Sequence, residues 1–179
     1  QVGKTCHSVV RNVLRIIPCD SAWPIFQSGI RFREFQGSET LVVLGYDKGQ
    51  VINVLWPELQ KWIPDNELGI YRPFARGGTR EPTWDRHPIL TLRCGSRVIF
   101  LTYDQKASVC AGVKAKFVLP DEQMPLPFFN ELDERGRTRG GIQWTMGFTP
   151  HRVEGRPDTG ADGWLKDMWT GKNTRSHKV

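Results

Sequence analysis

Gly3-Lys4-Thr5 stands at the head of a stretch, residues 4–17, that has the periodicity of an amphipathic helix. The apolar residues of this stretch recur at the i, i+3, i+4, i+7 spacing of a helix that packs on a sheet: Cys6, Val9, Val10, Val13, Leu14 and Ile17. Glycine, lysine and a hydroxyl residue that open a helix form the last part of the phosphate-binding signature G-x-x-x-x-G-K-[ST]. Such a loop joins a strand to a helix, so this feature predicts an α/β fold.

The chemistry of this loop gives each of its residues a role. Backbone N–H groups before the helix, together with the helix dipole, hold phosphate oxygens. Gly3 would let the backbone approach the phosphates closely, and Lys4 would place a cation on the β- and γ-phosphates. The Thr5 hydroxyl would ligate Mg²⁺. The same tripeptide also occurs in ordinary loops, so the helix that begins at this point adds weight to the prediction.

The first glycine of the full signature would fall before Gln1. We therefore expect the chain to begin inside its own phosphate loop, with the strand that leads into that loop missing. A length of 179 residues suits one domain with a core of its own. The prediction is a single, incomplete P-loop ATPase domain over residues 1–179, with a mainly parallel sheet flanked by helices.

Apolar runs predict the remaining elements of this fold. Three runs are typical of strands in a parallel sheet, at residues 40–44, 114–119 and 142–146. Two more runs, 89–93 and 97–102, flank a glycine-containing turn and predict an inserted β-hairpin. Helices are predicted after Asp47 with a kink or break at Pro57, at 127–134 and at 161–169.

The predicted strand at 114–119 runs into Pro120-Asp121-Glu122. Asp121, at the carboxyl end of a strand, would hold Mg²⁺ opposite the phosphates. Glu122 would act as the general base on the attacking water. An acidic turn after a strand is common, so the pair gains its meaning from its position downstream of the phosphate loop.

The strand predicted at 142–146 leads to Thr149-Pro150. Thr149 would lie beside the γ-phosphate and sense its hydrolysis, or the run is simply a strand that ends in a proline turn. The residues alone leave both interpretations open.

A basic loop is predicted by the run ERGRTRGG, which carries Arg135, Arg137 and Arg139. These arginines would contact DNA phosphate, or place a cation on the γ-phosphate of a neighbouring subunit, or belong to a solvated loop. The net charge of +6 favours a polyanionic partner, although a merely basic enzyme fits it equally well.

The cysteines and histidines argue against a disulfide framework or a zinc site. The chain has four of each, with no C-x-x-C or H-x-x-x-H spacing, and this usage suits a reducing cytoplasm. No apolar run approaches the length of a membrane span, so no membrane partner is expected.

The order of these motifs resembles the ATPase domain of the large terminase subunit. That subunit is the motor that packages double-stranded DNA into the heads of tailed bacteriophages and herpesviruses. The resemblance covers essentially the whole chain, through the opening Gly-Lys-Thr and four later runs: LRCGSRVIF at 92–100, GVKAKFVLPDE at 112–122, FTP at 148–150 and Gly-Trp at 163–164. Cys94 stands where the family usually has asparagine, and Pro120 replaces a commoner apolar residue.

The resemblance implies an ATP hydrolase that uses Mg²⁺. It implies a nucleotide site formed by Gly3, Lys4, Thr5 and Cys6, a metal site completed by Asp121, and catalysis by Glu122 with Lys4. Thr149 would link hydrolysis to DNA movement. Implied partners are double-stranded DNA, the small terminase subunit, the portal protein and further copies of the chain in a ring. The implied location is the host cytoplasm, with transient docking on the procapsid. Nothing in the chain resembles the carboxylate cluster of the family's nuclease domain, so we assign no nuclease activity.

Three alternatives remain open at this level. A helicase-like ATPase shares both motifs, but its second motif more often continues as Asp-Glu-x-His or Asp-Glu-x-Asp, where this chain has Asp-Glu-Gln-Met. A non-catalytic nucleic-acid-binding module would carry Gly-Lys-Thr by accident. A chain without its first strand would also lack independent stability.

Overall fold

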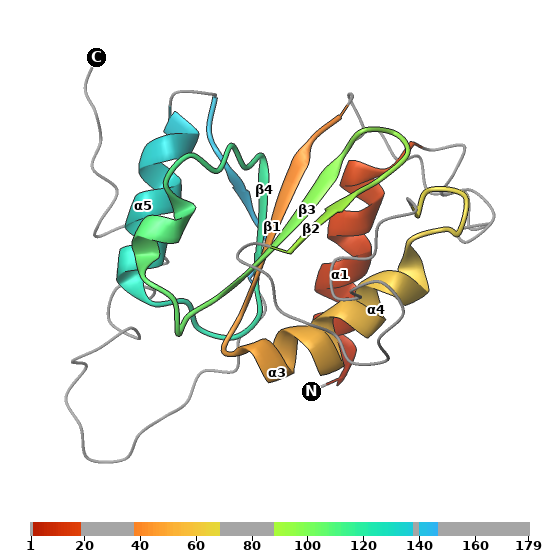
Figure 1. Cartoon of the computed structure of the whole chain (residues 1–179), viewed down its shortest axis with the longest axis horizontal. Coiled ribbons are helices and arrows are strands. Elements are labelled where there is room, and N and C mark those ends of the chain that lie inside the picture. The colour runs from red at the N-terminus through yellow and green to blue at the C-terminus, as the bar shows by residue number, and fades with distance from the viewer. Residues whose placement is uncertain (1, 19–37, 69–87, 138–139, 147–179) are drawn as a thin grey trace.

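A mainly parallel sheet forms the centre of the fold in a computed structural model that describes residues 2–18, 38–68, 88–137 and 140–146 (Figure 1). Its described strands are β1 Thr40–Gly45, β2 Ile89–Thr91, β3 Arg97–Thr102, β4 Phe117–Pro120 and β5 Gln143–Trp144. They lie in the order β2-β3-β1-β4-β5. The pairs β3–β1, β1–β4 and β4–β5 are parallel, whereas β2 pairs with β3 antiparallel. The predicted mainly parallel α/β sheet is thus confirmed. The predicted hairpin forms, but it is not an insertion, because its second strand, β3, pairs with β1 as part of the sheet.

The central strand β1 is buried on both of its faces. Leu41, Val42, Val43 and Leu44 are all fully buried. Val43 lies opposite Phe100 of β3 on one side and Leu119 of β4 on the other. A continuous apolar run of this kind is what a parallel strand covered by helices requires, because neither of its faces meets water.

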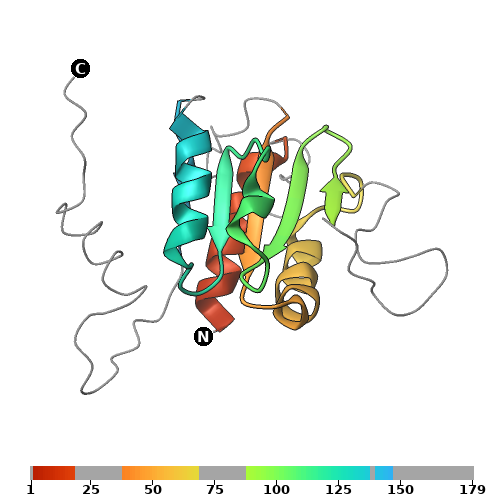
Figure 2. The ribbon, with the colours of Figure 1, turned by 60° about the vertical axis from the view of Figure 1, so that its left-hand side comes forward.

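Helices cover both faces of this sheet. They are α1 Val2–Ile16, α3 Lys48–Gln50, α4 Trp56–Trp62 and α5 Leu126–Arg137. Figures 1 and 2 show α1 and α5 on opposite sides of the sheet. The alternation of β1 side chains agrees with this arrangement, since Leu41 and Val43 pack in the core with α1 and α4, and Val42 and Leu44 pack with α5.

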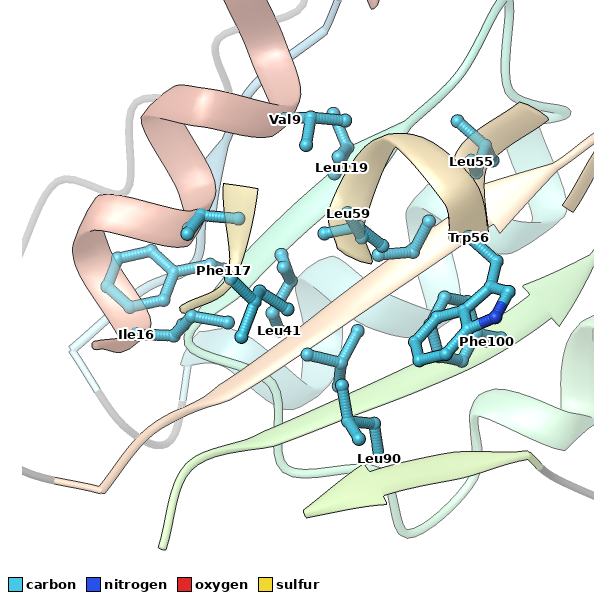
Figure 3. Close-up of a cluster of buried hydrophobic side chains, with 14 of the residues drawn as sticks. Val9, Ile16, Leu41, Leu55, Trp56, Leu59, Leu90, Phe100, Phe117 and Leu119 are labelled. Carbon is cyan, nitrogen blue, oxygen red and sulfur yellow. The ribbon is translucent and has the colours of Figure 1, made fainter. Parts of the chain in front are cut away.

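The core between the sheet and α1 and α4 is the larger of the two (Figure 3). Within it, Val9 of α1 lies beside Leu119, and Ile16 of α1 lies near Leu41 and Phe117. The rings of Trp56 and Phe100 pack edge to face, with their centroids 5.7 Å apart. The apolar stripe predicted for residues 4–17 is therefore the face that fixes α1 to the sheet.

A buried arginine also fixes α1 along the sheet. The Arg15 side chain is only 5% exposed and donates a hydrogen bond from Nη1 to the Thr145 hydroxyl over 3.1 Å. Its guanidinium lies over the Phe117 ring, 5.4 Å from the centroid. These contacts join the carboxyl end of α1 to β4 and to the residue after β5.

The helix after β1 begins as predicted, but it is not broken at Pro57, which lies within α4. Asp47 caps α3 by accepting a hydrogen bond from the Gln50 amide over 2.7 Å. A π-helical stretch, Val51–Leu55, joins α3 to α4 and ends two residues before Pro57. Proline lacks an amide proton, and a π-helical turn is one way in which a helix accommodates the missing hydrogen bond.

The structure corrects the prediction of a basic loop at 134–141. Helix α5 continues to Arg137, so Arg135 and Arg137 lie in its last turn. Gly136 lies within this helix. Its lack of a side chain allows close packing, because a methyl group there would overlap Cγ1 of Ile142. The strand predicted at 142–146 is shorter than expected, and the helix predicted at 161–169 lies outside the described residues.

Gly136→Ala is expected to destabilise the chain, although alanine is the better helix former. The intrinsic gain is about 0.5–1 kcal/mol, whereas forcing extra volume into a packed site costs about 1–3 kcal/mol. Urea unfolding should therefore give a lower free energy of unfolding for this variant. Gly49→Ala is the comparison at an exposed glycine of α3, where a methyl group would lie 3.2 Å from Oδ1 of Asp47, and it should cost less stability than Gly136→Ala. A stabilised Gly136→Ala variant would contradict this packing.

Candidate functional site

Two motifs that are far apart in the sequence meet at the carboxyl edge of the sheet. Helix α1 begins near this edge, and β1, β3 and β4 end there (Figure 1). The Thr5 hydroxyl, in the first turns of α1, donates a hydrogen bond to Oδ1 of Asp121 over 3.2 Å. Asp121 directly follows β4. Ligands of open α/β sheets bind outside the carboxyl ends of the strands, so this contact marks the candidate site.

The Asp121 carboxylate is held in a mostly buried environment. The residue is 9% exposed. Burial raises the pKa of Asp121 above its ordinary value, the Thr5 hydrogen bond opposes this rise, and the neighbouring Glu122 charge adds to it. Functional carboxylates often share these features, burial at a strand end and a pKa raised by that burial.

Gln50 is a second partner of Asp121 that the sequence analysis missed. Its Nε2 donates to Oδ2 of Asp121 over 2.8 Å, and its Oε1 accepts a hydrogen bond from the Tyr46 amide. Gln50 lies in α3, just past the carboxyl end of β1. Only its position after β1 could have indicated this role from the sequence, because residues that follow neighbouring parallel strands gather at the same edge of the sheet.

The loop after β3 supports the same edge from the other side. The Tyr103 hydroxyl donates to the backbone oxygen of Asp121 over 3.3 Å. Burial, and then the charge of Asp121, raise the pKa of Tyr103 well above its ordinary value, so this phenol remains a neutral donor. The Thr102 amide donates a hydrogen bond to Oε1 of Gln105, and the Thr102 hydroxyl donates one to Oδ1 of Asp104. These bonds hold the turn that carries Tyr103.

Glu122 has an unusual backbone. Its φ angle is +65°, in the left-handed region that residues other than glycine seldom adopt, and its side chain is exposed. The residue before it is fixed to β1, because the Asp121 amide donates a hydrogen bond to the Leu44 backbone oxygen over 2.8 Å. Pro120, which has no amide proton, is the last residue of β4, and the hydrogen bonding to β1 continues with the next amide, that of Asp121. A strained residue that directs a carboxylate into solvent beside Asp121 is consistent with a catalytic position.

The other predicted site residues are placed as follows. The backbones of Gly3 and Lys4 lie in the first turn of α1, where the amide protons of a helix have no partner within the helix, but their side chains are not described. Cys6 is half-buried and lies near Glu58 of α4; burial first, and then that carboxylate, raise the pKa of its thiol. Thr149 and Arg139 lie outside the described residues.

Arg135 and Arg137 are not brought to the Thr5–Asp121 pair. They are exposed on α5, which covers the other face of the sheet from α1. Each makes an ion pair within its own helix, Arg135 with Glu131 at 2.9 Å and Arg137 with Asp133 at 2.8 Å. Exposed pairs of this kind contribute little to stability, so both arginines remain able to exchange partners.

The oxygen donors at this edge fit Mg²⁺. A hydroxyl and a carboxylate are hard ligands of the kind that Mg²⁺ prefers, and this ion commonly takes only one or two protein ligands beside phosphate and water. Among the described residues, no three or more His, Cys, Asp and Glu side chains gather into a metal-binding group. The Thr5–Asp121 pair is therefore where the described chain would hold such an ion with a phosphate ligand.

Comparisons with protein-family models, with curated proteins and with solved structures found no match to this chain. None of the helices in the described part of the chain has the length and apolar character that crossing a bilayer requires.

Asp121→Asn is expected to raise the stability of the metal-free chain at neutral pH. Burial raises the pKa of Asp121 in the folded state, so over the interval between its unfolded and folded pKa the folded chain binds more protons. The stability that this proton contributes is complete below the unfolded pKa, about 3.9, and is lost as the pH rises through the folded pKa. Asparagine avoids this loss because it does not ionise.

Urea unfolding from about pH 4, near the ordinary pKa of an aspartate, to neutral pH measures this difference. The gap between Asp121→Asn and the unmodified chain should widen in favour of the variant as the pH rises. Asp65→Asn, in an exposed turn, is the matched control and should show no such gap. An Asp121→Asn variant that is less stable than the unmodified chain at neutral pH would rule out this electrostatic account.

Proposed function

We propose that this chain is the ATPase domain of a motor of the large-terminase type, which hydrolyses ATP to move double-stranded DNA into a viral procapsid. The observation that carries the ATPase is the hydrogen bond from Thr5 to Asp121. It supports a P-loop NTPase domain, because a loop hydroxyl and an aspartate at a strand end are the protein groups that hold Mg²⁺ in that class. The packaging part of the proposal rests on the order of the motifs along the chain.

In this proposal the residues around the site divide the chemistry between them. The free amide protons in the first turn of α1 bind phosphate oxygens, and Lys4 adds a positive charge to them. Mg²⁺, held by Thr5 and Asp121, supplies further positive charge against the phosphates when it is bound. Glu122 accepts a proton from the attacking water at its carboxylate.

The proposed motor acts on DNA together with other proteins. Its partners are the small terminase subunit, the portal protein and further copies of this chain in a ring, in the host cytoplasm and transiently on the procapsid. Thr149 couples hydrolysis to DNA movement. The net charge of +6 supports a polyanionic partner. The ion pairs of Arg135 and Arg137 lie at the surface, where DNA phosphates or a neighbour's nucleotide can compete for the guanidinium groups.

The direct test is ATP binding, measured by calorimetry with and without Mg²⁺. It uses this chain and a form extended at its amino terminus, since the signature predicts loop residues before Gln1. We expect Mg²⁺-dependent binding by the extended form, lost in Lys4→Ala and kept in Lys114→Ala, an exposed lysine that precedes β4. Absence of binding by both forms would overturn the proposal.

Further assays on the form that binds ATP test the individual roles and the rival functions. Glu122→Gln should keep ATP binding and lower turnover about 10²–10⁴-fold, the range for removal of a general base. Unchanged turnover would contradict that role. Unwinding of a forked duplex would favour a helicase-like ATPase over a packaging motor. Salt-sensitive DNA binding without any nucleotide dependence would favour a non-catalytic nucleic-acid-binding module.

A further inference from the structure

Gln50 joins three separate parts of the carboxyl edge of the sheet. Its side-chain amide donates to Oδ2 of Asp121 over 2.8 Å. Its side-chain oxygen accepts from the Tyr46 amide, and its own backbone amide donates to Oδ1 of Asp47 over 2.7 Å. The side chain therefore spans from the end of β1 to the end of β4, and its backbone is fixed by the cap of α3.

The orientation of the Gln50 amide is determined by its partners. The Tyr46 amide can only donate, so the side-chain atom that faces it must be the oxygen. The nitrogen then faces Asp121, whose ionised carboxylate can only accept. A flipped side chain would set two donors against each other at one end and two acceptors at the other.

Close packing at Gly45 brings Gln50 within reach of Asp121. A methyl group at position 45 would lie 2.6 Å from Cγ2 of Val51 and 3.3 Å from Oε1 of Gln50. Glycine thus lets the start of the helix approach the end of β1. With this close approach, the Gln50 side chain reaches Asp121 at the end of the neighbouring strand β4.

We propose that Gln50 is a positioning residue for the metal site: it holds Oδ2 of Asp121 so that Oδ1 stays directed to Thr5 and to a divalent cation bound there. Thr5 engages Oδ1 and Gln50 engages Oδ2, so the two bonds fix the plane of the carboxylate. Partners behind a metal ligand orient it, and their loss typically lowers metal affinity about 10–100-fold. This inference rests on the proposed function, because it assumes a nucleotide-associated cation at Asp121.

Gln105 offers a matched control within the same sheet edge. Its side-chain oxygen accepts from the Thr102 amide at the end of β3, as that of Gln50 accepts from Tyr46 at the end of β1. Its backbone amide also donates to the Thr102 oxygen, over 3.2 Å. Gln105 supports the turn of Tyr103, which contacts only the backbone oxygen of Asp121, whereas Gln50 bonds the carboxylate itself. Gln105→Met therefore controls for a loosened sheet edge in which the carboxylate keeps both of its side-chain donors. Methionine keeps the length of either side chain and removes its hydrogen bonds.

The experiment measures Mn²⁺ binding by electron paramagnetic resonance in the presence of ATP, on the form of the chain that binds ATP. We expect Gln50→Met to weaken Mn²⁺ binding about 10–100-fold relative to both the unmodified chain and Gln105→Met. ATP affinity in EDTA and the thermal midpoint should match those of Gln105→Met, because the loss is confined to the cation. Gln50→Asn, whose amide is too short to span to Asp121, should reproduce the effect if Gln50→Met does not fold.

The outcomes separate this inference from the function on which it rests. Equal Mn²⁺ affinity in Gln50→Met and Gln105→Met, with binding intact in the unmodified chain, would overturn the role of Gln50 alone. A loss of ATP affinity in EDTA as large as the loss of Mn²⁺ affinity would mean that Gln50 is merely structural. An unmodified chain that binds neither ATP nor Mn²⁺ would overturn the proposed function, and this inference with it.

Discussion

Burial of β1 on both faces is the constraint on which the rest of the structure depends. Residues 41–44 are fully buried and bond to β3 on one side and to β4 on the other. Because alternate side chains enter different cores, α1 and α4 must cover one face of the sheet and α5 the other. Helix α1 then starts near the edge where β4 ends, and Thr5 meets Asp121 there. The geometry of the site is thus a consequence of how the sheet is packed.

Periodicity predicted the elements but not all of their ends. The apolar stripe in residues 4–17, the run at 40–44 and the cap at Asp47 each describe one element through its own local sequence, and all three predictions are confirmed. The predicted end of α5 at residue 134 is wrong, because the glycine-containing run ERGRTRGG favours a loop by its local sequence, whereas the helix continues to Arg137. In the structure Gly136 is helical and makes room for Ile142, a packing requirement that no local pattern reveals.

The candidate site was predictable where a topological rule links distant motifs. Thr5 and Asp121 are 116 positions apart in the sequence, yet a phosphate loop and a strand-end aspartate are both expected at the carboxyl edge of the sheet. Gln50 has no comparable local signal, since an ordinary glutamine in a first helical turn acquires its meaning only from Asp121, 71 positions away. The left-handed backbone of Glu122 is likewise set by tertiary context rather than by its residue type.

A double-mutant cycle between Thr5 and Asp121 tests the central claim most directly. Thr5→Val, Asp121→Asn and the double variant are compared by their Mg²⁺-dependent affinity for ATP, in the form of the chain that binds it. If both residues hold one cation, the double variant should lose little more affinity than either single variant, with a coupling energy of about 0.5–3 kcal/mol. Losses that add to within about 0.5 kcal/mol, or no loss at all, would contradict a shared metal site.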